Sequence, residues 1–188
     1  MGKILMGPEM LLRTIPVILV GAIVDDKPNF MAVAAAGFAS REPPMISMAI
    51  RPNRYTYKGI RQNSAFSINV PSIELIEETN YCGTVSGADV DKVEACKFSI
   101  FYGNSSSAPL IDQYPINMEC KIVHLLELGS HVLVIGEVEE THVTESCMTD
   151  GKLDFDKIKP FTYTMGAGHE YRVMGEIIGT PDVRRNPR

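Results

Sequence analysis

The chain of 188 residues has no apolar run that approaches the roughly 20 residues a helix needs to cross a bilayer. Its longest candidate, Ile15–Val24, is followed at once by Asp25 and Asp26. The N-terminus also lacks the basic start and apolar block of a secretory signal. We therefore expect a cytoplasmic protein that does not enter membranes.

Positive charge is also scarce, because 18 basic residues face 23 acidic ones and leave a net charge of −5. Nucleic-acid backbones reward clustered cations, so this balance argues against a nucleic-acid partner. One short basic run, Arg184, Arg185 and Arg188, lies near the C-terminus. We expect a solvated tail there, over residues 180–188.

Cysteines are few and lie at least 14 positions apart, and no Cys-x-x-Cys pair occurs. Their spacing therefore indicates neither a metal site nor a disulfide framework. A chain of this length buries a substantial core without such staples. We expect one domain over residues 1–188, with its core at about 14–179, in a reducing compartment. The four cysteines are Cys82, Cys96, Cys120 and Cys147.

The chain does contain a succession of β-strand signals, rich in Val and Ile and bounded by turn residues. The last two strands flank Gly129-Ser130, a short hairpin turn. Successive strands with few long helical repeats predict a mainly β barrel or sandwich. Six strands are expected, at Ile15–Val24, Phe30–Ser40, Met45–Arg51, Ala65–Val70, Asn117–Leu128 and His131–Val143.

Some of these strands are apolar on both faces. Val132 and Val134 point one way from their strand, while Leu133 and Ile135 point the other. One set fills a barrel, and the other needs cover from helices or from a second subunit. Of the two, we favour a homodimer.

Short helices interrupt the strands. Asn53 is expected to cap the first, which ends near Asn63, and Ser72 to cap the second. Asp89 is expected to cap a third, which runs through Val93.

The stretch Arg51–Tyr57 is the most informative local feature, because a strand ends in a cation and a helix begins at once. The first turn of a helix offers unpaired N–H groups and a partial positive charge, which suit a phosphate. Arg51, Arg54 and Thr56 add charge and a hydroxyl. An ordinary solvated helix start is the alternative.

Two further stretches suggest contact with a ligand. In Cys82–Gly87, two glycines allow the backbone a close approach, and Ser86 and Lys92 add polar groups, although a plain loop would look similar. In Ala32–Ser40, a run of alanines occupies a strand, for which alanine is a poor former. A flat aromatic ring against the backbone explains that run, and so does tight packing against a neighbour.

In this order, these stretches resemble the flavin reductase-like FMN-binding family, and its flavoredoxin branch most closely. The resemblance covers residues 14–140 and depends on the combination of short matches. The matching stretches are Pro16–Gly21, Lys27–Asn29, Pro43-Pro44, Arg51–Tyr57, Phe66–Pro71, Gly83-x-x-Ser86-Gly87-x-x-x-Asp91-Lys92, Glu119–Lys121, Gly129–His131 and Gly136–Val138.

The resemblance implies a six-stranded Greek-key split β-barrel, usually dimeric, with FMN near the subunit interface. It also implies three groups of cofactor-binding residues. Backbone groups of Ala36, Gly37, Phe38, Ala39 and Ser40 would line the isoalloxazine; Arg51, Tyr55 and Thr56 would hold the phosphate, with Asn69 nearby; Ser86, Gly87 and Lys92 would close the site beside the thiol of Cys82.

His131 is the one histidine that the resemblance places near the site, as a catalytic residue for a nicotinamide. Related reductases often carry Gly-Asp-His at the hairpin turn, where this chain has Gly129-Ser130-His131. A histidine packed at a barrel edge is the alternative. No metal is expected, because a turn at Gly129-Ser130 pairs His131 with Leu128 and His124 with Ile135. The two imidazoles then lie about 13 Å apart, too far to share an ion.

The function expected is that of an FMN flavoprotein, a flavin reductase or flavoredoxin-like oxidoreductase in electron transfer. The electrons would come from NAD(P)H or from a redox protein. Two alternatives are a protein-to-protein electron carrier without NAD(P)H activity and a non-enzymatic barrel that binds a phosphate-bearing ligand.

Overall fold

A computed structural model describes residues 2–165 and 168–181. The basic run of Arg184, Arg185 and Arg188 lies outside these residues, and residues 174–181 form neither helix nor strand. Among the described residues, no helix combines the length and the hydropathy that a membrane span requires.

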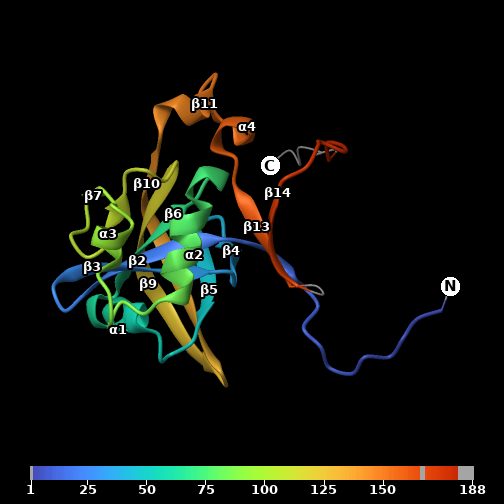
Figure 1. The fold of residues 1–188 in the computed structure, drawn as a ribbon, viewed down its shortest axis with the longest axis horizontal. Coiled ribbons are helices and arrows are strands. Elements are labelled where there is room, and N and C mark those ends of the chain that lie inside the picture. Colours follow the sequence, from blue (N-terminus) through green and yellow to red (C-terminus); the bar gives the residue numbers. More distant parts are fainter. Residues whose placement is uncertain (1, 166–167, 182–188) are drawn as a thin grey trace.

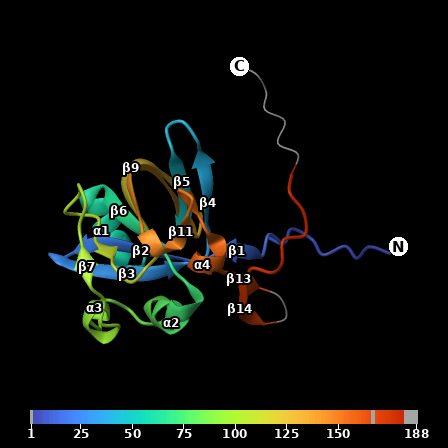
Figure 2. The same ribbon diagram turned by 90° about the horizontal axis from the view of Figure 1, so that it is seen from above.

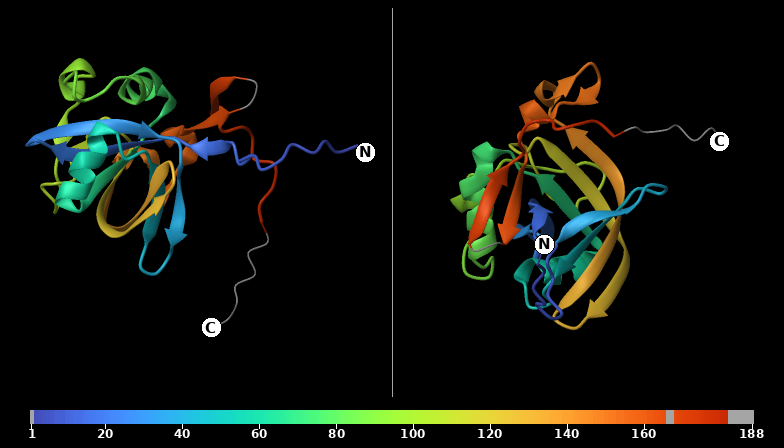
Figure 3. Two further views of the ribbon diagram at one scale, coloured as in Figure 1. Left: turned by 90° about the horizontal axis from the view of Figure 1, so that it is seen from below. Right: turned by 90° about the vertical axis from the view of Figure 1, so that its right-hand side faces the viewer.

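The centre of the molecule is a seven-stranded sheet of order β3-β2-β6-β9-β10-β5-β4, with every pair antiparallel. The sheet curves strongly, so that β9 and β10 wrap around the interior (Figure 3). The mainly β prediction is confirmed. The strands are β2 (Ile18–Val24), β3 (Lys27–Val33), β4 (Ala36–Ser40), β5 (Met45–Ile50), β6 (Ala65–Val70), β9 (Ile116–Leu128) and β10 (His131–Val143).

Two of the six predicted strands are each divided in the structure, and one of these divisions gives the central sheet seven strands where six were expected, since β1 joins another sheet. The stretch 30–40 breaks at Ala34-Ala35, where the chain crosses from β3 to β4 at the other end of the strand order. The stretch 15–24 breaks at Val17. By contrast, Gly129 turns the β9–β10 hairpin with φ of 58°, and the register pairs His131 with Leu128 as predicted.

The remaining elements lie around this sheet (Figure 1). A three-stranded sheet joins β1 near the N-terminus to β13 and β14 near the C-terminus. They are β1 (Thr14–Pro16), β7 (Ile100–Phe101), β8 (Leu110–Ile111), β11 (Met148–Thr149), β12 (Lys152–Leu153), β13 (Phe161–Met165), β14 (His169–Val173), α1 (Tyr55–Asn63), α2 (Ile76–Thr84), α3 (Lys92–Ala95), α4 (Phe155–Ile158) and the 3-10 turns Ile73–Leu75 and Glu145–Cys147.

The helix starts depart partly from prediction. Ser72 does cap, by accepting from the N–H of Glu74, but it caps the 3-10 turn that precedes α2. Asp91, and not Asp89, caps α3. Arg54, and not Asn53, occupies the cap position of α1, and no side chain caps that helix.

The apolar residues divide into an inner and an outer core. The inner core fills the barrel, where Val20, Val134 and Ile60 of α1 are fully buried. The outer core contains Leu19 and Phe30 and lies between β2–β3 and the helices α2 and α3, which cover that face (Figure 2). Burial of each such side chain contributes about 1.5–3 kcal/mol. Helices thus cover the outer face of β2 and β3, and the homodimer favoured as cover for the second face of β10 stays a prediction.

Candidate functional site

A pocket of about 100 Å³ lies where the start of α1 meets β3 and the loop that follows α2. It brings together six residues that the sequence singled out for cofactor binding: Tyr55, Thr56, Cys82, Ser86, Gly87 and Lys92. We call it the anion pocket. Its other lining residues are Met31, Ala32, Asn53, Arg54, Gly83 and Val85.

The uncapped N-terminus of α1 forms one wall of the anion pocket. No side chain caps this nine-residue helix, and none of the described residues accepts from the N–H of Tyr55 or Thr56. Such first-turn groups carry the positive end of the helix dipole. The guanidinium-bearing Arg54 lines the same pocket. The wall therefore presents hydrogen-bond donors and positive charge to a bound anion.

Lys92 supplies a second, buried cation. It is only 3% exposed, and its Nζ donates to the carbonyl oxygens of Phe30 and Cys82, both at 2.8 Å. An ammonium group has three N–H donors, so one remains. Burial lowers the pKa of Lys92, and the positive charge of Arg54 lowers it further. An anion in the pocket would oppose both effects and favour the charged lysine.

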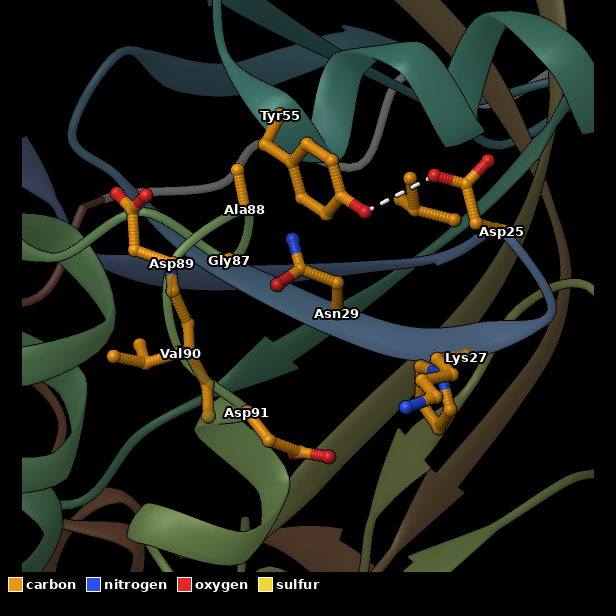
Figure 4. A pocket seen from close by; sticks show the side chains of 12 residues that line it. Asp25, Lys27, Asn29, Tyr55, Gly87, Ala88, Asp89, Val90 and Asp91 are labelled. Carbon is orange, nitrogen blue, oxygen red and sulfur yellow. Dashed lines mark hydrogen bonds between the residues drawn. The ribbon is translucent and has the colours of Figure 1, made fainter.

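Asn29 of β3 ties the helix start to the glycine loop. Its Nδ2 donates to Oγ1 of the buried Thr56 at 2.6 Å, which leaves the threonine hydroxyl proton free to donate elsewhere. On its other side, a Cβ built on Gly87 would lie 1.8 Å from Asn29 Oδ1. Glycine at position 87 therefore lets the loop approach closely. Figure 4 shows the Asn29 side chain beside Gly87 and below the ring of Tyr55.

A larger cavity of about 370 Å³ adjoins the anion pocket and shares Tyr55, Gly87 and Lys92 with it. We call it the outer cavity. Three carboxylates line it, from Asp25, Asp89 and Asp91, against the single further cation Lys27 (Figure 4).

Asp25 is held in this cavity from two sides. It accepts from Lys58 Nζ at 2.7 Å and from the Tyr55 hydroxyl at 3.1 Å, and these bonds lower its pKa. The carboxylate is therefore charged at neutral pH, and the outer cavity is acidic.

A third cavity of about 340 Å³ shares Ala32 and Gly83 with the anion pocket and continues along β3 to Ala34. We call it the aromatic cavity. Tyr163 and His169 stack with ring centroids 5.8 Å apart, and the Tyr171 hydroxyl donates to Asn80 at 3.1 Å. Its further lining residues are Val17, Asn80, Thr84, Tyr163, His169 and Tyr171.

Sequence reasoning missed this aromatic group, which comes from the β13–β14 hairpin. The hairpin lies far along the chain from the other predicted site residues. The signal that could have found it is the pairing of Tyr163 with Tyr171 and of Met165 with His169 across two short strands. This signal is weak in the sequence, because each of the two strands has only five residues.

Arg51 and Asn69 do not join the site. Arg51 is exposed and lines none of the three cavities, whereas Arg54 lines the anion pocket. Asn69 is 0% exposed and bonds within the protein: its Nδ2 donates to Leu19 O, and its Oδ1 accepts from Ile111 N and Asn117 Nδ2. With donors and acceptors occupied, Asn69 holds strands together and has none left for a ligand.

The predicted ring contacts and His131 also lie apart from the three cavities. Ala36–Ser40 forms the edge strand β4, and Phe38 and Ser40 line a separate cavity of about 470 Å³. The residues of the alanine run that reach the site are Ala32 and Ala34, in the part before the chain crosses over. His131 lies at the β9–β10 turn, where its Nδ1 is 2.8 Å from Ser130 Oγ.

Comparison with known proteins agrees with this architecture. The family model described as "Flavin reductase like domain" matches residues 12–163. A flavoredoxin from Methanosarcina acetivorans is 33% identical with a TM-score of 0.90, and the match covers 96% of this chain and 95% of that one. The flavoredoxin of Desulfovibrio vulgaris (Miyazaki F) is 32% identical with a TM-score of 0.88, covering 97% and 98% respectively.

A relative known from its sequence also matches this chain. A protein of Archaeoglobus fulgidus is 33% identical over 132 residues, which cover 70% of this chain and 73% of that protein. A protein with a split-barrel domain from Shewanella frigidimarina, 23% identical with a TM-score of 0.78 over 89% of this chain and 86% of that one, shares the fold. The predicted family and the mainly β, split-barrel fold are thus confirmed, and the chain belongs to the flavin reductase-like family as a flavoredoxin-like member.

Proposed function

We propose that this protein binds FMN without a covalent bond and uses it as a flavoredoxin-like oxidoreductase. The phosphate would lie in the anion pocket, and the ring would extend along Ala32 and Ala34 toward the aromatic cavity. The observation that carries the proposal is the uncapped start of α1, which opens into a pocket lined by Arg54 and Lys92. The likeness to two flavoredoxins supports it.

The chemistry of the anion pocket suits a phosphate monoester. The N–H groups of Tyr55 and Thr56 and the hydroxyls of Thr56 and Ser86 are neutral donors, and Arg54 and Lys92 are charged ones. Helix N-termini bind phosphate through such groups, and charge-assisted hydrogen bonds are the stronger kind. A volume of about 100 Å³ admits one phosphate group and excludes a ring system.

The acidic outer cavity favours FMN over FAD. A dinucleotide would have to place its second phosphate and adenosine beyond the anion pocket, toward Asp25, Asp89 and Asp91. Like charges repel, and no ion pair among the described residues neutralises Asp89 or Asp91, whereas Asp25 is paired with Lys58. A monophosphate ends before this region. We therefore expect FMN to bind more tightly than FAD.

The bound flavin supplies the hydride and electron chemistry, and the protein binds and orients it. In the proposed arrangement, Tyr163, His169 and Tyr171 cover the ring region from the β13–β14 hairpin. None of them is required as a proton donor when hydride arrives. His131, which lies at a different turn, has no part in the proposal.

We further propose a homodimer, since part of the barrel surface remains apolar and uncovered. Phe38 on β4 is 73% exposed, and on β9 Leu126 and Leu128 are 47% and 56% exposed. A second copy would bury them. Sedimentation at micromolar concentration measures the mass of the particle. A monomer would refute the homodimer and leave the proposal of FMN binding unaffected.

A titration of the flavin-free protein with FMN, riboflavin and FAD tests the main proposal. We expect yellow protein after purification, and affinity in the order FMN, then FAD and riboflavin. Anaerobic addition of NADH or NADPH then distinguishes a reductase, which bleaches the flavin spectrum rapidly, from an electron carrier, which does not. A colourless protein whose absorption spectrum and melting temperature do not change when any of the three flavins is added would refute the proposal. That result would favour a non-enzymatic phosphate-binding barrel.

A further inference from the structure

Two of the four cysteines meet beside the anion pocket, although 13 residues separate them in the chain. Cys82 lies on α2, is 1% exposed and lines the pocket, whereas the half-buried Cys96 follows α3. Their Sγ atoms are 4.0 Å apart. Cys120 and Cys147 lie in other parts of the core, each without a cysteine neighbour among the described residues.

The segment between the two thiols forms much of the pocket wall. It contains Ser86, Gly87 and Lys92, and Lys92 Nζ donates to the backbone carbonyl of Cys82 at 2.8 Å. The cysteines therefore stand at the two ends of a loop, residues 83–95, that faces the ligand site. A covalent bond between them would close this loop.

We propose that Cys82 and Cys96 form a reversible disulfide that restrains loop 83–95 and slows the release of the anionic ligand. The disulfide itself is independent of the proposed function, and only the identity of the ligand rests on it. A disulfide has an S–S distance of about 2 Å, so the sulfurs must approach by about 2 Å. Side-chain rotation and a small shift of α3, which has four residues, can provide that approach.

The oxidant would be a low-molecular-weight disulfide. The thiolate of Cys96, the more exposed of the two, attacks one sulfur of the small disulfide, breaks its S–S bond and releases one thiol. The thiolate of Cys82 then attacks Cys96 Sγ in the mixed disulfide and releases the second thiol. Two protein thiols become one disulfide, and one small disulfide becomes two thiols. Burial raises the pKa of both cysteines, so only a small fraction of each is thiolate at neutral pH and the exchange is slow. Each proton that a protein thiol loses passes to the departing small thiolate.

Peptide mapping tests the bond. The full-length protein is equilibrated with glutathione mixtures of increasing oxidised fraction, alkylated and analysed by mass spectrometry. We expect a linked Cys82–Cys96 peptide that disappears after dithiothreitol, while Cys120 and Cys147 stay alkylated. Cys96→Ser should abolish the linked peptide and retain the melting temperature of the reduced protein. Absence of the linked peptide at the highest oxidised fraction would overturn the proposal.

Hydrogen exchange tests the restraint without any flavin. Amides of residues 83–95 should exchange at least about threefold more slowly in the oxidised protein, because closing the loop removes open conformations. FMN release, followed by the recovery of its fluorescence, should slow by a similar factor in the wild type and stay unchanged in Cys96→Ser. Equal exchange in the two redox states would refute the restraint. If exchange slows and no flavin binds, only the proposed function fails.

Discussion

The two arginines at the β5–α1 junction offer a matched test of where the phosphate binds. Arg54 lines the anion pocket, whereas Arg51, three residues earlier, is exposed and lines none of the three cavities. We expect Arg54→Ala to weaken FMN binding and Arg51→Ala to leave it nearly unchanged. Both substitutions remove one positive charge, so any long-range effect of charge on the anion is the same for both.

The magnitude follows from the kind of bond that is lost. A hydrogen bond to a charged group contributes about 1.5–3 kcal/mol, and the lower part of that range applies because Arg54 is exposed to solvent. A loss of about 1–2 kcal/mol corresponds to a dissociation constant about 5- to 30-fold larger. For Arg51→Ala we expect a change below about twofold, from screened charge alone.

The assay is fluorescence titration of the flavin-free variants with FMN and with riboflavin, which lacks the phosphate. Arg54→Ala should weaken the binding of FMN and leave the binding of riboflavin unchanged, and melting curves should confirm that both variants fold. Equal losses of FMN affinity in Arg51→Ala and Arg54→Ala would refute this placement of the phosphate. A loss of riboflavin affinity in Arg54→Ala as large as the loss of FMN affinity would refute it as well.

Three further predictions concern other parts of the site. Gly87→Ala should reduce FMN affinity at least about tenfold, because the added Cβ would lie 1.8 Å from Asn29 Oδ1. The control Gly37→Ala, which has open space around its Cβ, should bind FMN normally in the same titration. Since the pKa of Lys92 lies below the usual lysine value of 10.5, the FMN affinity of the wild type should fall as rising pH removes that charge. Lys92→Arg should flatten the profile, and an equally steep one would count against the role of Lys92. Asn69→Leu should lower the free energy of unfolding by about 2–4 kcal/mol in urea, since two buried donors lose their acceptor, yet the folded variant should bind FMN with unchanged affinity.

The sequence predicted well those features that depend on neighbouring residues. The bounds of β6 and β10 and the register of the β9–β10 hairpin match prediction, because apolar runs bounded by turn residues and a short glycine turn determine them locally. The general position of the anion pocket was also predictable, since a strand end, a helix start and a glycine loop carry visible signals. The family resemblance placed these signals in one site.

What the sequence did not reveal depends on contacts between distant segments. The break at Ala34-Ala35 is hidden within a uniform alanine run, and it decides which alanines reach the site. Asn69 resembles a ligand-binding residue until Asn117, 48 positions away, is seen to donate to it. Which of Arg51 and Arg54 lines the anion pocket depends on the path of a single turn. The β13–β14 hairpin lies far along the chain from Ala32 and Ala34, so local sequence signals do not reveal that they line the same cavity.

The position of Asn29 has a consequence for how the cofactor would influence folding. This one side chain bonds Thr56 at the start of α1 and lies against Gly87 in the loop, so neither wall of the pocket is complete unless β3 is also in place. A partly unfolded chain would therefore have no high-affinity site, and FMN would bind the native state alone. At a free concentration 100 times its dissociation constant, the cofactor would then stabilise the protein by about 2.7 kcal/mol. Cells short of FMN would consequently hold this protein in a form that unfolds more readily and is more open to proteolysis.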